Sequence, residues 1–303
     1  MRTAYLGTSE FAATVLRRLA SSPHRPSLVV TPPDRRQGRG RKVSPPPAAL
    51  AARELGLDLL QAENVNDESA LARIRAAQPQ AVLVCAFGQL IREPLLSEYP
   101  LLNVHPSLLP RWRGAAPIER SIMAGDATTG VCVMQLTAGL DSGPVALREE
   151  TAIDPGEDFG ALSARLADLG GDLLVRALDL QAEGALEFTE QDEDGVTYAE
   201  KIESAERRLD PERPAAELAA KVRALTPHVG AYLELPGGDR LGVRRADAVV
   251  SVAGIELGEL AGVDGALLLG TGEGALQLEV VQPAGGKPMS AADYLRGHQL
   301  PGA

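Results

Sequence analysis

The sequence lacks any apolar run approaching the about 20 residues that a membrane-spanning helix needs. Its beginning, MRTAYLGTSEF, also lacks the apolar stretch of a secretory signal, so we expect a cytoplasmic protein. It has only two cysteines, Cys85 and Cys132, which lie far apart in strand-like apolar runs. This pattern favours buried thiols in a reducing compartment and argues against a disulfide framework or a zinc site.

Basic charge is also scarce. The chain has 30 Lys and Arg against 41 Asp and Glu, for a formal net charge of -11. Because phosphate contacts need Lys and Arg, we do not expect a protein that coats nucleic acid nonspecifically. A local basic patch is nevertheless present in PPDRRQGRGRKVSPPP, whose cations are Arg35, Arg36, Arg39, Arg41 and Lys42.

Length and composition predict a globular protein of two domains. The 303 residues exceed one ordinary compact α/β unit and suit a domain of about 200 residues with a smaller one. Hydrophobic residues make up 45% of the chain and charged residues 23%, so a sizeable core can be buried.

The first part of the chain alternates short apolar runs with helical patterns. TAYLG reads as a buried strand and is followed by a helical pattern from Ser9 to Ala20. Similar segments follow in SLVVT, PPPAALAARELG, LDLLQ, ESALARIRAA and AVLVCAF, and a long amphipathic stretch runs from Phe159 to Glu183. This order predicts a Rossmann-like domain over residues 1–188, with a mostly parallel sheet between helices.

The remaining chain predicts a different kind of domain. Residues 189–205 are polar and acidic with few apolar anchors, which indicates an extended linker. In residues 206–303, one helical pattern, ERPAAELAAKVRAL, precedes short alternating runs separated by glycine turns. We therefore expect a smaller, mainly β domain, an OB-like barrel.

Two candidate catalytic residues lie in the segment LLNVHP. In an extended strand, Asn103 and His105 project to the same face, near an end where Pro106 stops regular pairing. A turn-capping amide and a histidine satisfied by backbone would explain each residue alone about as well. Their joint placement at the carboxyl end of a strand favours an oxyanion-binding pair. Ser107 is not in a GxSxG elbow, so a hydrolase triad is poorly supported.

A third candidate, Asp141, lies in the loop LTAGLDSGP. Gly139 and Gly143 permit tight turns that could bring the carboxylate close to a site, although on spacing alone an ordinary Asx turn is slightly favoured. If Asp141 reaches His105, it favours the imidazolium, which with Asn103 can stabilise a developing oxyanion. The reaction class would then be attack by a nucleophile on a carbonyl-like carbon.

The segments NVHPSLLPRWRGAAPIERS and TGVCVMQLTAGLDSGPV closely resemble the core of the methionyl-tRNA formyltransferases. The resemblance extends to LGTSEFA, PDRRQGRGRKVSPPP, CAFG, VTYAEKI and QPAGGKPMSAADYLRG, and so covers nearly the whole chain. It implies transfer of a formyl group from 10-formyltetrahydrofolate to the α-amino group of methionyl-initiator tRNA. We expect a monomer that needs no metal.

The resemblance also implies roles for particular residues. Asn103, His105 and Asp141 would be catalytic. The folate-binding wall would comprise Phe87, Gly88, Leu90, Ile91, Ser107, Leu108, Leu109 and Pro110. The basic loop would contact the acceptor arm of the tRNA through Arg35, Arg36, Arg39, Arg41 and Lys42, with Arg39 matching the family's critical arginine. The C-terminal domain would assist tRNA binding.

In one respect the sequence departs from the family, because His228 in LTPHVGAYLEL replaces an aromatic residue and puts stacking there in doubt. Arg244, Arg245 and Lys287 are candidate tRNA contacts in the C-terminal domain, although solvated surface charge explains any one of them better. An N-formyltransferase for an amino sugar nucleotide is the alternative enzyme, but it would not need the basic loop. An RNA-binding module on an inactive scaffold is opposed by retention of all three polar residues.

Overall fold

The computed structural model describes residues 1–37, 42–249 and 254–300. By packing, the chain divides into two compact units, which we describe separately. The first unit comprises Met1–Gly114, Thr128–Ala152 and Ser163–Tyr198, and the second comprises Ala115–Ala127, Ile153–Leu162 and Ala199–Ala303. The domain boundaries after residues 188 and 205 stay a prediction.

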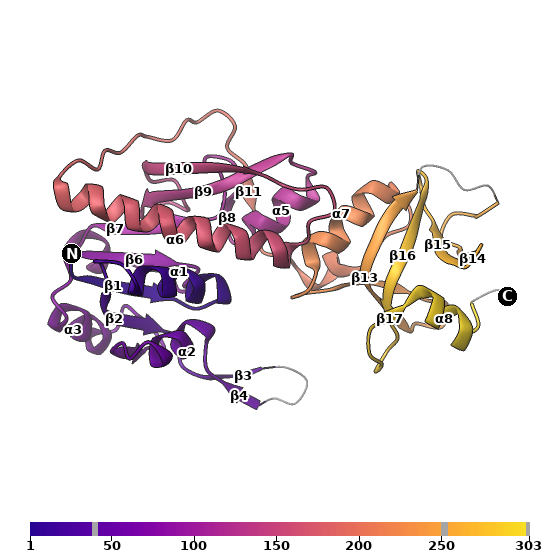
Figure 1. Ribbon diagram of the computed structural model, residues 1–303, viewed down its shortest axis with the longest axis horizontal. Coiled ribbons are helices and arrows are strands. Elements are labelled where there is room, and N and C mark those ends of the chain that lie inside the picture. Colours follow the sequence, from indigo (N-terminus) through magenta and orange to yellow (C-terminus); the bar gives the residue numbers. More distant parts are fainter. Residues whose placement is uncertain (38–41, 250–253, 301–303) are drawn as a thin grey trace. The chain divides into compact units, whose positions relative to one another are not determined.

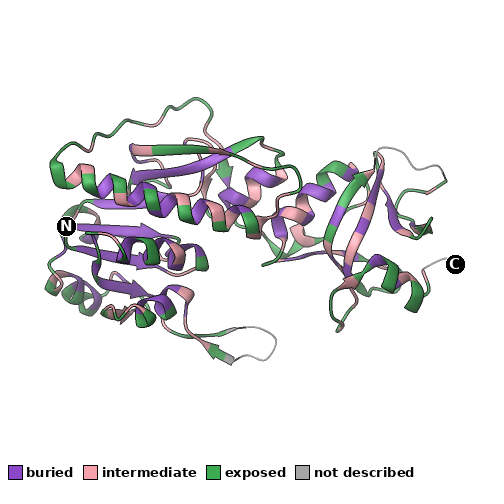
Figure 2. Cartoon of the chain, in the orientation of Figure 1, coloured by how far each residue is buried: buried purple, intermediate pink, exposed green. Residues whose placement is uncertain are grey.

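The first unit is built on a seven-stranded sheet with the order β10-β9-β7-β6-β1-β2-β5. Its strands are β1 (Thr3–Gly7), β2 (Pro26–Thr31), β5 (Leu59–Gln61), β6 (Ala81–Cys85), β7 (Leu101–His105), β9 (Thr128–Gln135) and β10 (Val145–Ala152). Five neighbouring strands of the sheet are parallel, namely β5, β2, β1, β6 and β7. β9 is antiparallel to both of its neighbours, β7 and β10. β1, β6 and β7 are buried throughout (Figure 2), as expected for apolar runs in a covered sheet. This sheet confirms the predicted Rossmann-like fold.

Helices cover both faces of the sheet (Figure 1). They are α1 (Glu10–Ala20), α2 (Pro47–Glu54), α3 (Glu68–Ala76), α4 (Leu95–Glu98) and α6 (Phe159–Glu183), the last from Ser163 onward. On one face, the apolar side of α3 shares a core cluster with Val82. On the other, α6 comes so close that a Cβ on Gly170 would lie 2.8 Å from Val104 Cγ1. Since side chains alternate along a strand, Asn103 and His105 lie on the face opposite α6.

The first unit also contains a two-stranded ladder that the sequence did not predict. β3 (Arg35–Gln37) pairs antiparallel with β4 (Lys42–Ser44). Figure 1 shows this ladder as separate from the seven-stranded sheet. Two of the predicted tRNA contacts, Arg39 and Arg41, lie outside the described residues.

The segment that follows α6 is extended. Between Gly184 and the 3-10 helix η1 (Ser204–Arg207), the described chain forms no helix. Thr189 makes a β-bridge with Val145. Further along, β11 (Tyr198–Ala199) pairs with β8 (Arg113–Gly114).

The second unit is mainly antiparallel β structure with the sheet order β12-β13-β16-β15-β14 and β17 paired with β16. Its strands are β12 (Ala231–Glu234), β13 (Arg240–Val249), β14 (Leu260–Val263), β15 (Ala266–Gly270), β16 (Ala275–Gln282) and β17 (Met289–Ser290). Its helices are α5 (Pro117–Met123), α7 (Ala215–Leu225) and α8 (Ala291–Gly297). The predicted strand-rich C-terminal part is therefore confirmed.

Both cysteines are buried free thiols, as predicted. Burial raises the pKa of Cys85 to about 12 and that of Cys132 to about 11, so both stay protonated near neutral pH. Among the described helices, none has the length and apolar character that crossing a membrane requires.

Candidate active site

Asn103 and His105 lie side by side near the carboxyl end of β7. Asn103 is opposite Val84 of β6 and Met134 of β9, and His105 is opposite Cys132 of β9. Only 7% of Asn103 and 4% of His105 is exposed. The predicted pair is therefore present on one face, at the end of the parallel strands where open α/β sheets hold their ligands.

His105 is held by the turn that follows it. Its Nε2 lies 2.8 Å from the carbonyl oxygen of Trp112. Because a carbonyl oxygen can only accept a hydrogen bond, Nε2 carries a proton. Buried Ser107 closes the same turn by donating its hydroxyl to the carbonyl oxygen of Arg111 at 2.7 Å. Nδ1 is therefore the ring nitrogen that this turn leaves available to another group.

Asp141 approaches that nitrogen from the loop between β9 and β10. Its Oδ2 lies 3.7 Å from Nδ1 of His105, and it accepts a hydrogen bond of 2.9 Å from the backbone N–H of Gly114. The first distance is that of an ion pair, longer than a hydrogen bond. The two side chains are 5% and 14% exposed, so little water screens the pair. The structure thus brings Asp141 beside His105.

The carboxamide of Asn103 makes no hydrogen bond to the parts of the chain that the structure describes. Its N–H2 group is therefore available to a ligand. Together with Nδ1–H of His105, where that nitrogen carries a proton, it offers two donors to an oxygen that becomes negative, and Asp141 lies beside the same ring. This set can act on a carbonyl-like carbon.

The segments expected to bind folate flank the same edge of the sheet. Cys85 at the end of β6 is opposite Val104, so the loop after β6 begins beside the end of β7. Of the expected contacts, Phe87, Ile91, Ser107 and Leu109 are buried, Leu108 and Pro110 are half-buried, and Gly88 and Leu90 are exposed. A ligand at this edge can meet the exposed side chain of Leu90 and the backbone at Gly88. The hydroxyl of Ser107 is already used within the protein.

The expected tRNA contacts that the structure describes lie on an exposed ladder. The side chain of Arg35 is 65% exposed and lies 4.0 Å from Glu63. Arg36 is exposed opposite Val43, which is itself 63% exposed. Lys42 joins the ladder through its backbone. The side chains of Arg35 and Arg36 are exposed to solvent, where phosphate groups can reach them.

Two residues of the extended segment reach the site and were missed from the sequence. Gln191 donates from Nε2 to the carbonyl oxygen of Asp141 at 2.8 Å. Thr197 accepts, at Oγ1, a hydrogen bond of 2.9 Å from the N–H of Trp112. Both lie in the polar stretch FTEQDEDGVTYAEKI, whose pattern has no periodicity that would mark a packed element.

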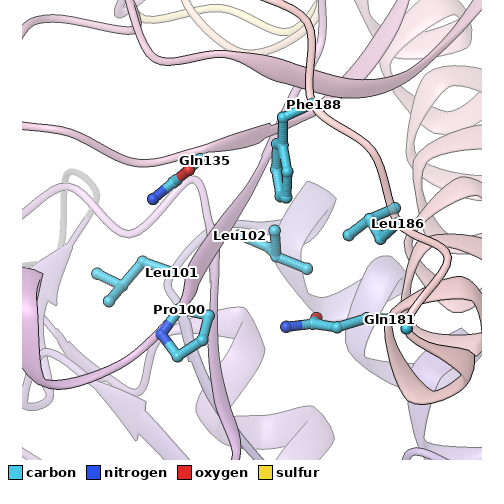
Figure 3. Close-up of a pocket in the computed structure, with 8 residues that line it drawn as sticks. Pro100, Leu101, Leu102, Gln135, Gln181, Leu186 and Phe188 are labelled. Atoms are coloured by element: carbon cyan, nitrogen blue, oxygen red, sulfur yellow. The ribbon is translucent and has the colours of Figure 1, made fainter.

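A pocket of about 280 Å³ lies at the other end of β7 (Figure 3). Its lining residues are Pro100, Leu101, Leu102, Gln135, Gln181, Gly184, Leu186 and Phe188. None of the predicted site residues is among them. Since Leu101 begins β7 and His105 ends it, this pocket is separate from the candidate site.

In the second unit, the ring of His228, the residue that stands in place of the family's aromatic, stacks on Phe159. Its ring centroid lies 3.7 Å from that of Phe159, with 25° between the planes. Its Nε2 lies 3.0 Å from Glu119 Oε1. A histidine at this position therefore still stacks within the unit.

The three cations proposed as C-terminal tRNA contacts differ in how they are held. Arg244 donates from Nε and Nη2 to Gln282 Oε1 at 3.1 and 2.6 Å. Arg245 forms an ion pair with Glu279, whereas Lys287 is exposed. Two of the three thus already have a partner inside the unit.

The arrangement can be compared with known proteins. A family model described as formyl transferase matches residues 1–178, and one described as formyl transferase, C-terminal domain, matches residues 201–299. The fold and the candidate site therefore define a formyl transferase. A methionyl-tRNA formyltransferase of Halorhodospira halophila is 44% identical over 302 residues, which cover 99% of this chain and 97% of that protein. The chain belongs to the methionyl-tRNA formyltransferase family.

Solved structures share the fold at low identity. HypX from Aquifex aeolicus, in complex with tetrahydrofolic acid, has a TM-score of 0.67 and 18% identity over 97% of this chain. This chain spans about half of HypX, 47% of its length. The N-formyltransferase from Helicobacter canadensis, in complex with folinic acid and dTDP-3-aminofucose, has a TM-score of 0.67 and 12% identity, with 91% of this chain and 98% of that chain covered. At these identities the likeness concerns the fold alone.

Proposed function

We propose that the chain transfers the formyl group of 10-formyltetrahydrofolate to the α-amino group of methionyl-initiator tRNA. The product is N-formylmethionyl-tRNA, which serves translation initiation. The observation that carries this proposal is the 44% identity, over 99% of the chain, to a methionyl-tRNA formyltransferase. A relative of that similarity and coverage includes both the catalytic part and the C-terminal part.

Asn103, His105 and Asp141 carry the chemistry in this proposal. 10-Formyltetrahydrofolate supplies the formyl group. The amine attacks its carbon, the bond from that carbon to N10 then breaks, and tetrahydrofolate leaves with N10 carrying the proton that the amine gives up. Asn103 and the imidazolium of His105 donate hydrogen bonds to the oxygen on which negative charge develops. Asp141 stabilises the charged ring and accepts the amine proton, directly or through one water. The free carboxamide of Asn103 and the distance of 3.7 Å between His105 and Asp141 support these roles.

Binding of the two substrates falls to the neighbouring segments. The folate is proposed to lie against Phe87, Gly88, Leu90, Ile91, Ser107, Leu108, Leu109 and Pro110. The acceptor arm of the tRNA is proposed to meet Arg35, Arg36, Arg39, Arg41 and Lys42. A chain with a net charge of -11 needs such a local concentration of cations to attract RNA.

We place the enzyme in the cytoplasm and propose that it acts as a monomer. Its buried free thiols suit a reducing compartment. The three proposed catalytic residues all belong to the first unit of one chain, so the site needs no residue from a second copy.

A comparison of acceptors tests the proposed function. With 10-formyltetrahydrofolate as donor, we expect charged initiator Met-tRNA to accept the formyl group while free methionine does not. Equal rates with both would contradict the tRNA proposal. Faster transfer to a dTDP-linked amino sugar would support the alternative enzyme instead.

A further inference from the structure

Asp141 has a backbone conformation that needs support. Its φ is +44°, in the left-handed region that residues other than glycine seldom adopt. Residues 137–140, which precede it, are all exposed, so they contribute little packing that could fix the loop. The position of the Asp141 carboxylate beside His105 therefore depends on contacts made from elsewhere in the chain.

Gln191 supplies such contacts to the backbone of the loop. Its Nε2 donates to the carbonyl oxygen of Asp141 at 2.8 Å and to that of Gly143 at 2.7 Å. Its Oε1 accepts hydrogen bonds from Nε and Nη2 of Arg113 at 3.0 and 2.8 Å. The side-chain amide of Gln191 thus binds the loop at Asp141 and at Gly143, and it connects both positions to Arg113.

The same short strand also holds the side chain of Asp141. Gly114, next to Arg113 in β8, donates its N–H to Asp141 Oδ2 at 2.9 Å. Backbone and carboxylate of Asp141 are therefore tied to neighbouring residues of one strand. Two tethers on one residue restrict both its position and its orientation.

Gln191 is itself held on both sides. Before it, Thr189 exchanges two backbone hydrogen bonds with Val145, of 2.8 and 2.9 Å. After it, Thr197 accepts from Trp112 N–H through its side chain and from Arg113 N–H through its carbonyl oxygen, both at 2.9 Å. Since Trp112 is also the residue that accepts from His105, the extended segment supports both members of the His105–Asp141 pair.

We infer that Gln191 is a positioning residue for the transfer reaction, which holds the Asp141 loop so that the carboxylate stays beside His105. This inference rests on the proposed function, in which Asp141 acts on His105. Gln191 acts through Asp141 and does not touch the reacting atoms. The segment between the predicted domains is then part of the scaffold of the active site.

The test is the single-turnover rate of formyl transfer by Gln191→Leu at saturating initiator Met-tRNA and 10-formyltetrahydrofolate. Leucine has nearly the same volume but makes none of the four hydrogen bonds. We expect the rate to fall by about 10- to 100-fold, as for small misplacements of catalytic groups, with both KM values within about threefold of the wild type. Gln282→Leu is the matched control, because Gln282 likewise accepts from an arginine, Arg244, and donates to a carbonyl oxygen, that of Gly286. Its rate should stay within about twofold of the wild type.

A double-variant cycle separates positioning from general damage. In an Asp141→Asn background, Gln191→Leu should lower the rate by less than about threefold, because the group that it positions has lost its charge. Equal losses in both backgrounds, or wild-type activity of Gln191→Leu, would overturn the inference. If Gln191→Leu folds poorly, Gln191→Glu keeps the pairing with Arg113 but sets an oxygen against two carbonyl oxygens, and the same loss is expected. Wild-type activity of Asp141→Asn would instead count against the proposed function.

Discussion

The candidate active site and the ladder of β3 and β4, which carries part of the basic loop, differ in how tightly the chain holds their side chains. Asn103 and His105 are 7% and 4% exposed, and His105 and Asp141 are each held by a backbone group. The side chain of Arg35, by contrast, is 65% exposed, and its guanidinium lies 4.0 Å from Glu63. A transition state needs donors at fixed distances, whereas attraction between phosphates and cations acts over several ångströms and tolerates variation. This difference is what the proposed roles require, catalysis by the first region and tRNA binding by the second.

The largest effect is expected from removing the free donor in the site. Asn103→Ala should lower the saturated single-turnover rate by on the order of 10²–10³, because one of two donors to the developing oxyanion is lost. The dissociation constant for Met-tRNA should not change. A filter-binding titration measures it alongside the rate. If Asn103→Ala weakened Met-tRNA binding by the same factor as it lowered the rate, Asn103 would contribute to tRNA binding as well as to catalysis.

Loss of charge at Asp141 should have the next largest effect. Asp141→Asn keeps an oxygen for the Gly114 N–H but cannot stabilise an imidazolium at His105, so we expect a loss of about 10²-fold in the saturated rate. Asp172→Asn is the control, since Asp172 is an exposed acid on α6 that pairs with Arg18. A similar loss in the control would mean that the effect is not specific to the site.

Periodic apolar patterns allowed most of the fold to be predicted. TAYLG was expected to be a strand and is β1, Thr3–Gly7, and the expected long helix is α6, Phe159–Glu183. These patterns reflect burial, which the sequence encodes directly. The ladder of β3 and β4 was missed because its strands are short and mostly polar, so no apolar pattern marks them.

The site could be predicted only in part from the residues themselves. That Asn103 and His105 share a face follows from the alternation of side chains along a strand. The approach of Asp141 does not, because its loop leaves β9 at Gln135, opposite Leu102 and far from His105. Only the path of the loop brings it back. The support from Gln191 depends on long-range hydrogen bonds of a polar segment, which also leave no pattern in the sequence.

A substitution in the basic loop is expected to have a smaller effect, and to change the KM for Met-tRNA where the previous substitutions change the saturated rate. Arg39→Ala should raise the KM for Met-tRNA about tenfold and leave the saturated rate unchanged, because one phosphate contact is lost. The slope of log K against log salt should become shallower by about 1. Arg73→Ala is the control, because Arg73 is a half-exposed cation on α3 that pairs with Asp58. An Arg39→Ala variant with a slow saturated rate would break the comparison.

The smallest effect is expected at the two thiols, which lie in the sheet beside the site. Burial raises the pKa of Cys85 to about 12 and that of Cys132 to about 11, so the native protein holds almost no thiolate at pH 8. A thiol reagent should therefore not react, and activity should persist, until the protein unfolds. Because the folded state favours the neutral thiols, their contribution to stability is present below the unfolded pKa and is lost as pH rises above it. Rapid labelling of Cys85 or Cys132 in the native enzyme would contradict the burial of these thiols in the sheet.

Whether the proposed catalytic residues and the basic loop act independently is tested most directly by kcat/KM for Met-tRNA in the double variant Asp141→Asn, Arg39→Ala. Independent sites lose transition-state stabilisation additively, so the double variant should show the product of the two single losses within about twofold. A double variant no slower than Asp141→Asn alone would show that the two regions act as one, and would contradict the account.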